Sequence, residues 1–172
     1  MTKDQKTKKG FTIIEVVLVL AIAGLIFLMV FVALPALQRS QRDTQRRDDM
    51  ARFMSQLNQY QANNNGATPT TGTGTEANLK TAYGNFITDY LRVGGDSFVD
   101  PNGQNYTIES VTKCTNAASC TQKSVAADTA GAKIRVYTNA TCNGEAPQYV
   151  SGDRKIAITY KLEGAGIYCG HN

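Results

Sequence analysis

The feature that most constrains this chain is an uninterrupted apolar run from Val16 to Leu37, which has 22 residues and no charged or polar side chain. As a helix it would be about 33 Å long, against a bilayer hydrocarbon core of about 30 Å. A helix that is apolar all round over this length exceeds what a small domain can bury, so the run predicts a membrane span. Glu15 stands directly before it, where a charge is costly unless it is paired.

The residues before the run are polar and basic. Residues 1–10 (MTKDQKTKKG) include four lysines and one aspartate, and so carry three of the chain's four net positive charges. A secretory signal has a shorter apolar region, of roughly 7–15 residues, before its cleavage site. We expect this lysine-rich leader to stay on the cytoplasmic side of the membrane. The rest of the chain is nearly neutral, which argues against a nucleic-acid binder with a strongly basic field.

Beyond the run, apolar residues recur with helical spacing. One face of an amphipathic helix is formed by Met50, Phe53, Met54, Leu57 and Tyr60. Because no turn signal separates this face from the apolar run, we predict one continuous helix over residues 11–63, roughly 80 Å long. Arginines and aspartates cover the remaining surface, and we expect them to be solvated or salt-linked rather than to bind DNA.

The C-terminal half alternates apolar and polar residues, as β-strands do. Such runs occur at 106–109, 133–136 and 155–162, and a last strand is expected at 166–169 after a turn at 163–164. One apolar face per strand predicts an antiparallel sheet with one buried side, which the amphipathic helix would cover. Residues 63–78 are typical of a loop, 85–92 of a short helix and 100–103 of a tight turn. The predicted fold class is α+β.

Four cysteines lie in the C-terminal half: Cys114, Cys120, Cys142 and Cys169. An even number beyond a membrane span predicts two disulfides and an oxidising compartment. Zinc is the alternative, but no CxxC pair is present. We favour Cys114–Cys120 with Cys142–Cys169, because the second bond would tie the last strand to an earlier loop.

No motif indicates catalysis or a bound cofactor. The chain has one histidine, His171, and lacks a glycine-rich phosphate loop, an HExxH and a GxSxG. Asp96, Asp100 and Asn102 could hold calcium in a turn, but their spacing does not match an EF-hand loop. We expect neither an enzyme nor a metal site.

The N-terminal residues resemble a known family. Gly10 followed by Phe11 and Glu15, opening a long apolar helix after a short basic leader, resembles the class III signal of type IV pilins. The segment Ala33–Arg47 (ALPALQRSQRDTQRR) also looks like pilins of Gram-positive-type bacteria. The C-terminal half is similar to pilins only in its expected architecture.

The resemblance implies roles for three residues. Prepilin peptidase would cut after Gly10, and Phe11 would become an N-methylated N-terminus. Glu15 would pair with the Phe11 amine of a neighbouring subunit, which would fix the register between subunits in a filament. The alternative is that Glu15 lies at the N-terminus of its own helix, where the helix dipole favours a negative charge. Both can hold, one in the membrane and the other in the filament.

Gly24 and Pro35 punctuate the apolar run. The resemblance implies that the helix loses order between a glycine and a proline of this region in the filament, although Pro35 lies further along than the family's usual proline. The alternative is a simple proline kink in a membrane helix.

These expectations divide the chain into five parts: a cleaved leader (1–10), a transmembrane and filament-core helix (11–38), an amphipathic helix on the sheet (39–63), a connecting loop with a short helix (64–103) and a disulfide-stapled sheet (104–172). The resemblance implies a major pilin: a membrane-inserted precursor that an assembly platform and motor build into a helical surface filament of identical subunits for adhesion, twitching motility or DNA uptake. The alternatives are a minor pilin or pseudopilin of a secretion or competence system, and a single-span anchored binding domain that never polymerises.

Overall fold

The computed structural model describes residues 10–70, 75–121, 132–164 and 166–172. The chain divides into two units, one up to Arg39 and one from Ser40 onward, and each is described by itself. A single helix, α1 (Ile13–Asn63), contains residues of both units and includes Pro35. The predicted continuous helix is therefore confirmed, with its start two residues later than expected.

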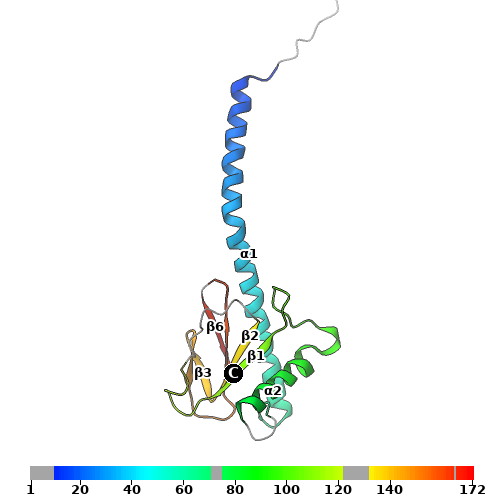
Figure 1. Ribbon diagram of the computed structural model, residues 1–172, viewed down its shortest axis with the longest axis vertical. Helices are drawn as coiled ribbons and strands as arrows, with labels where there is room; N and C mark the ends of the chain where they lie inside the picture. The colour runs from blue at the N-terminus through cyan, green and yellow to red at the C-terminus, as the bar shows by residue number, and fades with distance from the viewer. Residues whose placement is uncertain (1–9, 71–74, 122–131, 165) are drawn as a thin grey trace, which may run out of the picture. The chain divides into compact units, whose positions relative to one another are not determined.

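The second unit, from Ser40 onward, is built on a four-stranded sheet, part of which is labelled in Figure 1. Its order is β1-β2-β5-β6, and a separate two-stranded sheet pairs β3 with β4. The strands are β1 (Thr107–Lys113), β2 (Lys133–Thr138), β3 (Ala140–Asn143), β4 (Ala146–Tyr149), β5 (Ile156–Lys161) and β6 (Ile167–His171). The α+β class is confirmed.

The main sheet is mixed, and this corrects the expectation of a purely antiparallel one. β2–β5 and β5–β6 are antiparallel, but β1 runs parallel to β2. Parallel neighbours need a connection of roughly a dozen residues or more, and the sequence between Lys113 and Lys133 is long enough for one. The alternation in each strand was visible in the sequence, but alternation does not say in which direction a neighbouring strand runs.

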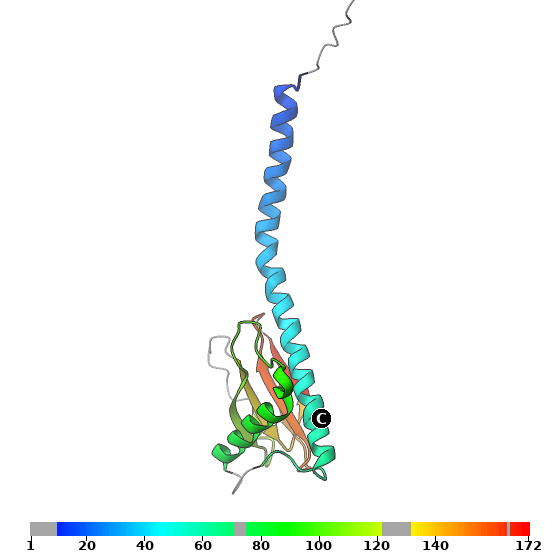
Figure 2. The ribbon, with the colours of Figure 1, turned by 90° about the vertical axis from the view of Figure 1, so that its right-hand side faces the viewer.

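One face of the sheet packs on the second half of α1, as predicted. Met50, Phe53 and Leu57 are fully buried in the core, and Tyr60 packs at its edge. Val136 and Ile158, paired across β2 and β5, belong to the same core. Figure 2 shows this part of α1 running alongside the sheet.

The opposite face is also covered, which corrects the expectation of a single buried side. Tyr137 and Ala157 form a second, smaller core on that face with Ala140 and the Cys114–Cys120 pair. The β3–β4 hairpin contributes to this cover through Ala140, Cys142 and Tyr149. As a result, every residue of β5 from Ile156 to Tyr160 is buried.

The segment between α1 and the sheet is more helical than predicted. α2 (Glu76–Phe86) begins inside the expected loop, because Thr75 caps it by accepting a hydrogen bond from the Asn78 amide and Glu76 lies in its first turn. A π-helical turn, η1 (Ile87–Leu91), and a short 3-10 turn, η2 (Val93–Gly95), follow. The predicted turn at 100–103 is confirmed, with the Gly103 amide donating to the Asp100 carbonyl at 2.7 Å.

Candidate functional site

The predicted processing site lies at the start of α1. Gly10 and Phe11 precede the first helical residue, and Phe11 is 88% exposed. The peptide bond between them therefore lies outside the helix. Whether it is cut stays a prediction.

Glu15 folds back on the first turn of its own helix. Its Oε2 accepts the backbone N–H of Thr12 at 3.3 Å and the Thr12 hydroxyl at 3.2 Å. This is the carboxylate half of a capping box, in which the third helical residue satisfies the amide of the N-cap residue. Within this chain Glu15 thus has the helix N-terminus as its partner, and its predicted pairing with the Phe11 amine of another subunit remains a prediction.

The first unit presents an apolar surface around α1. The large apolar side chains between Phe11 and Leu37 are 44–88% exposed. Within the part of the chain that the structure describes, α1 alone is long and apolar enough to cross a membrane. A surface of this kind requires either lipid or the apolar helices of other molecules around it.

The helix is continuous past both Gly24 and Pro35. Pro35 lacks an amide hydrogen, so the helix has one backbone hydrogen bond fewer at this point. The predicted loss of helical order concerns the filament, and it stays a prediction.

A buried ionic cluster, whose burial the sequence analysis did not predict, holds α1 to the sheet. The arginines and aspartates of this helix were expected to be solvated or salt-linked; Arg46 is salt-linked, but its side chain is only 1% exposed. It donates to Asp100 through Nε at 2.7 Å and Nη2 at 3.1 Å, and to Glu163 through Nη2 at 3.0 Å. The Tyr160 hydroxyl also donates to Asp100, at 2.6 Å. One helix residue therefore binds both the turn at 100–103 and the turn after β5.

Asp43 and Arg42 complete this ionic cluster. Asp43 accepts the amides of Glu163 and Gly164 at 2.9 and 2.8 Å, while Arg42 binds the Glu163 carboxylate at 2.7 Å. The predicted turn at 163–164 is thus bound to α1 by the adjacent Arg42 and Asp43 and by Arg46, one turn further along. A possible signal was the spacing of Arg42, Asp43 and Arg46. These residues continue the face that carries the apolar stripe and do not lie on the opposite side of the helix.

The pKa shifts within the ionic cluster follow from these contacts. Hydrogen bonding from Arg42, helped by Arg46, outweighs burial and lowers the pKa of Glu163 to about 2. Burial alone would raise the pKa of Asp100, but the donors Arg46, Tyr160 and the Asn102 amide lower it below its ordinary value. Burial would lower the pKa of Arg46, and its three carboxylate partners raise it instead. All three groups are held in their charged forms.

The four cysteines form the pairs that the sequence analysis favoured. Cys114 is bonded to Cys120 and Cys142 to Cys169. The second bond joins β3 to β6, so it ties the hairpin to the edge strand of the main sheet.

The acidic residues weighed for calcium have other partners. Arg52 pairs with Asp96 at 2.7 Å, and Asp100 is saturated by Arg46 and Tyr160. Among the described residues, no group of three or more metal-binding side chains occurs.

Comparison with known proteins gives one family match. Residues 5–31 fit the prokaryotic N-terminal methylation motif. Neither the curated proteins nor the solved structures give a match to this chain.

The matched motif spans Gly10, Phe11 and Glu15, and it is the class III signal peptide of type IV pilins. It implies processing by prepilin peptidase, pilus assembly and a membrane-anchored precursor, and its family is structural rather than enzymatic. The long N-terminal helix followed by a small α+β unit fits the pilin fold. This signal and this fold together support a precursor of the type IV pilin and pseudopilin type.

Proposed function

We propose that the mature chain is the main structural subunit of a type IV pilus filament. The observation that supports this most is the exposed apolar surface between Phe11 and Leu37, much of which lies within the matched signal. In the membrane, lipid covers this surface. After extraction by an assembly platform and its motor, only the same surface of other subunits can cover it.

The proposed assembly step uses the new N-terminus. Cleavage after Gly10 leaves a positively charged, N-methylated amine on Phe11. In an apolar filament core, an unpaired amine and an unpaired carboxylate would each be costly. Pairing this amine with Glu15 of a neighbour satisfies both groups and selects one register between subunits.

The polymer would be helical and open-ended, because each subunit uses a different surface for the neighbour on either side. The filament would leave the cytoplasmic membrane and extend from the cell surface. Adhesion, twitching motility and DNA uptake are the roles such a filament serves in this family.

The test is the intact mass and N-terminal peptide of material sheared from the cell surface. We expect an abundant chain that starts at Phe11, is one methyl group heavier and is four hydrogens lighter for two disulfides. A processed but scarce chain would instead indicate a minor pilin or pseudopilin. A chain that keeps residues 1–10 and stays in the membrane would overturn the proposal and leave a non-polymerising anchored domain.

A further inference from the structure

We propose that the unit from Ser40 onward binds a neutral oligosaccharide in a groove beside the end of α1. The groove lies between that end, the segment 67–70 and the α2–η1 helices. Its first part is a hollow of about 220 Å³, lined by Tyr60, Phe86 and Tyr90 and by the polar side chains of Thr70, Asn85 and Asp89.

The aromatic residues of the groove form a rigid platform. Phe86 is 2% exposed and packs against both tyrosines, edge-on to Tyr60 at 5.8 Å and stacked with Tyr90 at 5.2 Å between ring centroids. Tyr60 and Tyr90 are half-buried and meet edge to face at 5.3 Å. Because these rings hold one another, the platform is pre-organised and a ligand would not need to order it.

The polar side chains stand one helical turn apart beside the platform. Asn85 and Asp89 are four residues apart and both exposed, so an amide and a carboxylate border the rings. Together they offer acceptors and donors to adjacent hydroxyl groups. Asp89 and Tyr90 lie on the π-helical turn η1, an element that is rare and frequent at functional sites.

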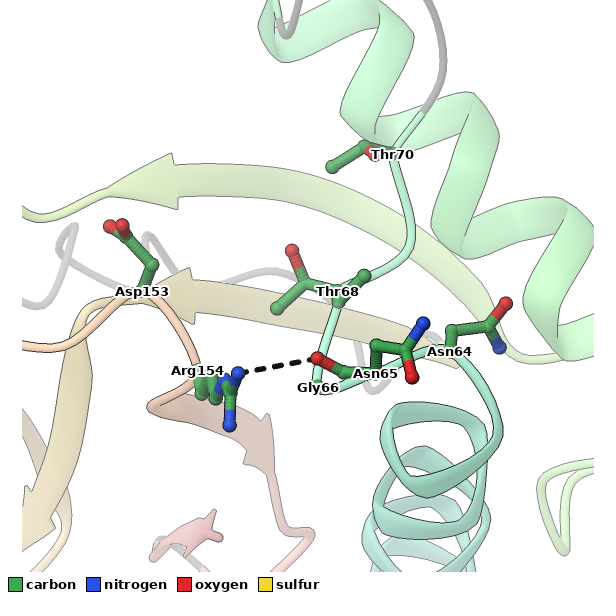
Figure 3. Close-up of a pocket in the computed structure, with 8 residues that line it drawn as sticks. Asn64, Asn65, Gly66, Thr68, Thr70, Asp153 and Arg154 are labelled. Atoms are coloured by element: carbon green, nitrogen blue, oxygen red, sulfur yellow. Dashed lines mark hydrogen bonds between the residues drawn. The ribbon is translucent and has the colours of Figure 1, made fainter.

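A second hollow of about 430 Å³ adjoins the first, since Thr70 lines both. Polar side chains border it, with Asn64, Asn65 and Thr68 on one chain segment and Asp153 and Arg154 on another. Figure 3 shows these side chains around the hollow and Arg154 donating to the Asn65 carbonyl, at 3.2 Å. The proposed groove thus combines an aromatic hollow with a second hollow bordered by hydroxyl, amide and charged side chains.

The charged and aromatic side chains that line the groove indicate which class of ligand it would bind. Among the residues that the structure describes, one carboxylate and no lysine or arginine line the aromatic hollow, so it disfavours a polyanion such as DNA. A quaternary ammonium would fit a cage of several ring faces, whereas here Phe86 is buried beneath the tyrosines. In the second hollow the charges of Asp153 and Arg154 balance. Aromatic faces beside amide, hydroxyl and carboxylate groups suit the apolar faces and hydroxyl edges of linked neutral sugar rings.

The experiment uses the processed full chain in mild detergent, so its outcome does not depend on filament formation. The protein is applied to an array carrying chitotriose, maltotriose, lactose, acidic hyaluronan fragments and choline, and the tightest binder is then titrated by calorimetry. We expect binding to at least one neutral oligosaccharide. Tyr90→Leu should weaken it about tenfold, and Asn85→Ala and Asp89→Ala should each weaken it.

Tyr149→Leu is the matched control, because Tyr149 is also half-buried but packs against the second core. It should leave the affinity unchanged. If Tyr90→Leu does not fold, the exposed Asn85 and Asp89 substitutions decide. The proposal is overturned if no neutral oligosaccharide binds, if only choline or hyaluronan binds, or if the groove substitutions and the control have equal effects.

Discussion

Arg46 Nε lies 2.7 Å from Asp100 Oδ2, and both side chains are 1% exposed. The pair joins α1 to the turn at 100–103, which precedes β1 in the chain. The buried guanidinium binds three carboxylates, and two of them, Asp100 and Glu163, lie outside α1, so a shift of the helix against these turns would break its contacts. We infer that the pair fixes the register of α1 on the sheet rather than adding much net stability, because desolvation offsets most of its attraction.

Removing Arg46 should therefore lower the free energy of unfolding, even though the ion pair itself adds little net stability. Arg46→Met leaves Asp100 buried without its partner, and we expect a loss of about 3–5 kcal/mol in the free energy of unfolding. Urea unfolding of the full chain in detergent measures it. The neighbouring exposed Arg47, changed to Met, should cost within about 0.5 kcal/mol. Equal losses for the two variants would show that Arg46 is not a buried anchor.

Glu163 should make the fold sensitive to acid. Its pKa is lowered from an ordinary 4.5 to about 2, chiefly by Arg42. Since the folded-state pKa is the lower one, its stabilising effect is complete above about pH 4.5 and is lost as the pH falls towards 2. Glu163→Gln should be less stable than the parent by about 1–3 kcal/mol near pH 7, and the difference should shrink as the pH approaches 2.

This comparison also separates Glu163 from groups of opposite effect. Burial raises the pKa of Asp49 in spite of its hydrogen bond from Tyr106. Asp49 therefore takes up its proton at a higher pH in the folded protein than in the unfolded chain, and this favours folding as the pH falls. That contribution is common to both proteins and cancels in their difference. A difference that stays constant from pH 7 to pH 2 would contradict the assignment to Glu163.

Much of the fold could be predicted because it depends on periodicity. The uncharged run before Leu37 and the spacing of Met50, Phe53 and Leu57 each indicate one element, and burial in the structure follows them. The missed β3–β4 hairpin did carry a signal, since its two-residue turn, Gly144-Glu145, has glycine at the first position and Gly144 has a φ of 61°. Its strands are four residues each, too short for alternation to be noticed.

The ionic cluster could not be predicted from local sequence in the same way. Arg46, Asp100 and Glu163 are brought together by chain segments 54 and 117 residues apart. Arginine side chains are mostly exposed in proteins, so the sequence alone predicts that Arg46 is exposed. The Gly10, Phe11 and Glu15 signal is the opposite case, because its residues are adjacent and can be recognised without a fold.

The two disulfides should differ in their effect on stability. Cys142–Cys169 closes a sequence separation of 27 and Cys114–Cys120 one of 6. In the chain-entropy model their loss costs about 3.5 and 2 kcal/mol, respectively. Urea unfolding of the Cys142→Ala/Cys169→Ala and Cys114→Ala/Cys120→Ala variants tests the order. A larger loss for the short loop would show that packing of the fully buried Cys114 dominates over loop closure.

Gly66 should resist substitution. Its φ is 81°, and an added Cβ would overlap the Arg154 guanidinium. Gly66→Ala should lower the unfolding free energy by about 1–2 kcal/mol, mainly through backbone strain. Gly84, within α2, has open space around its Cα, and Gly84→Ala should be neutral or stabilising by up to about 1 kcal/mol. Thermal unfolding of the two variants and the parent measures these effects. A Gly66→Ala protein as stable as the parent would contradict the predicted backbone strain.

Glu15 has two possible partners, and a pair of variants separates them. Glu15→Gln removes the carboxylate, and with it the proposed pairing to the Phe11 amine of a neighbour. Thr12→Ala keeps the carboxylate but removes the hydroxyl that contacts it at 3.2 Å within the same chain. If assembly depends on the pairing, both proteins are cut after Gly10, but only Glu15→Gln gives a sharply reduced yield of sheared filaments. The measurement is the amount of processed chain in the sheared and membrane fractions. Equal yields from Glu15→Gln and the parent would remove the pairing, and equal reductions in both variants would assign Glu15 to capping its own helix.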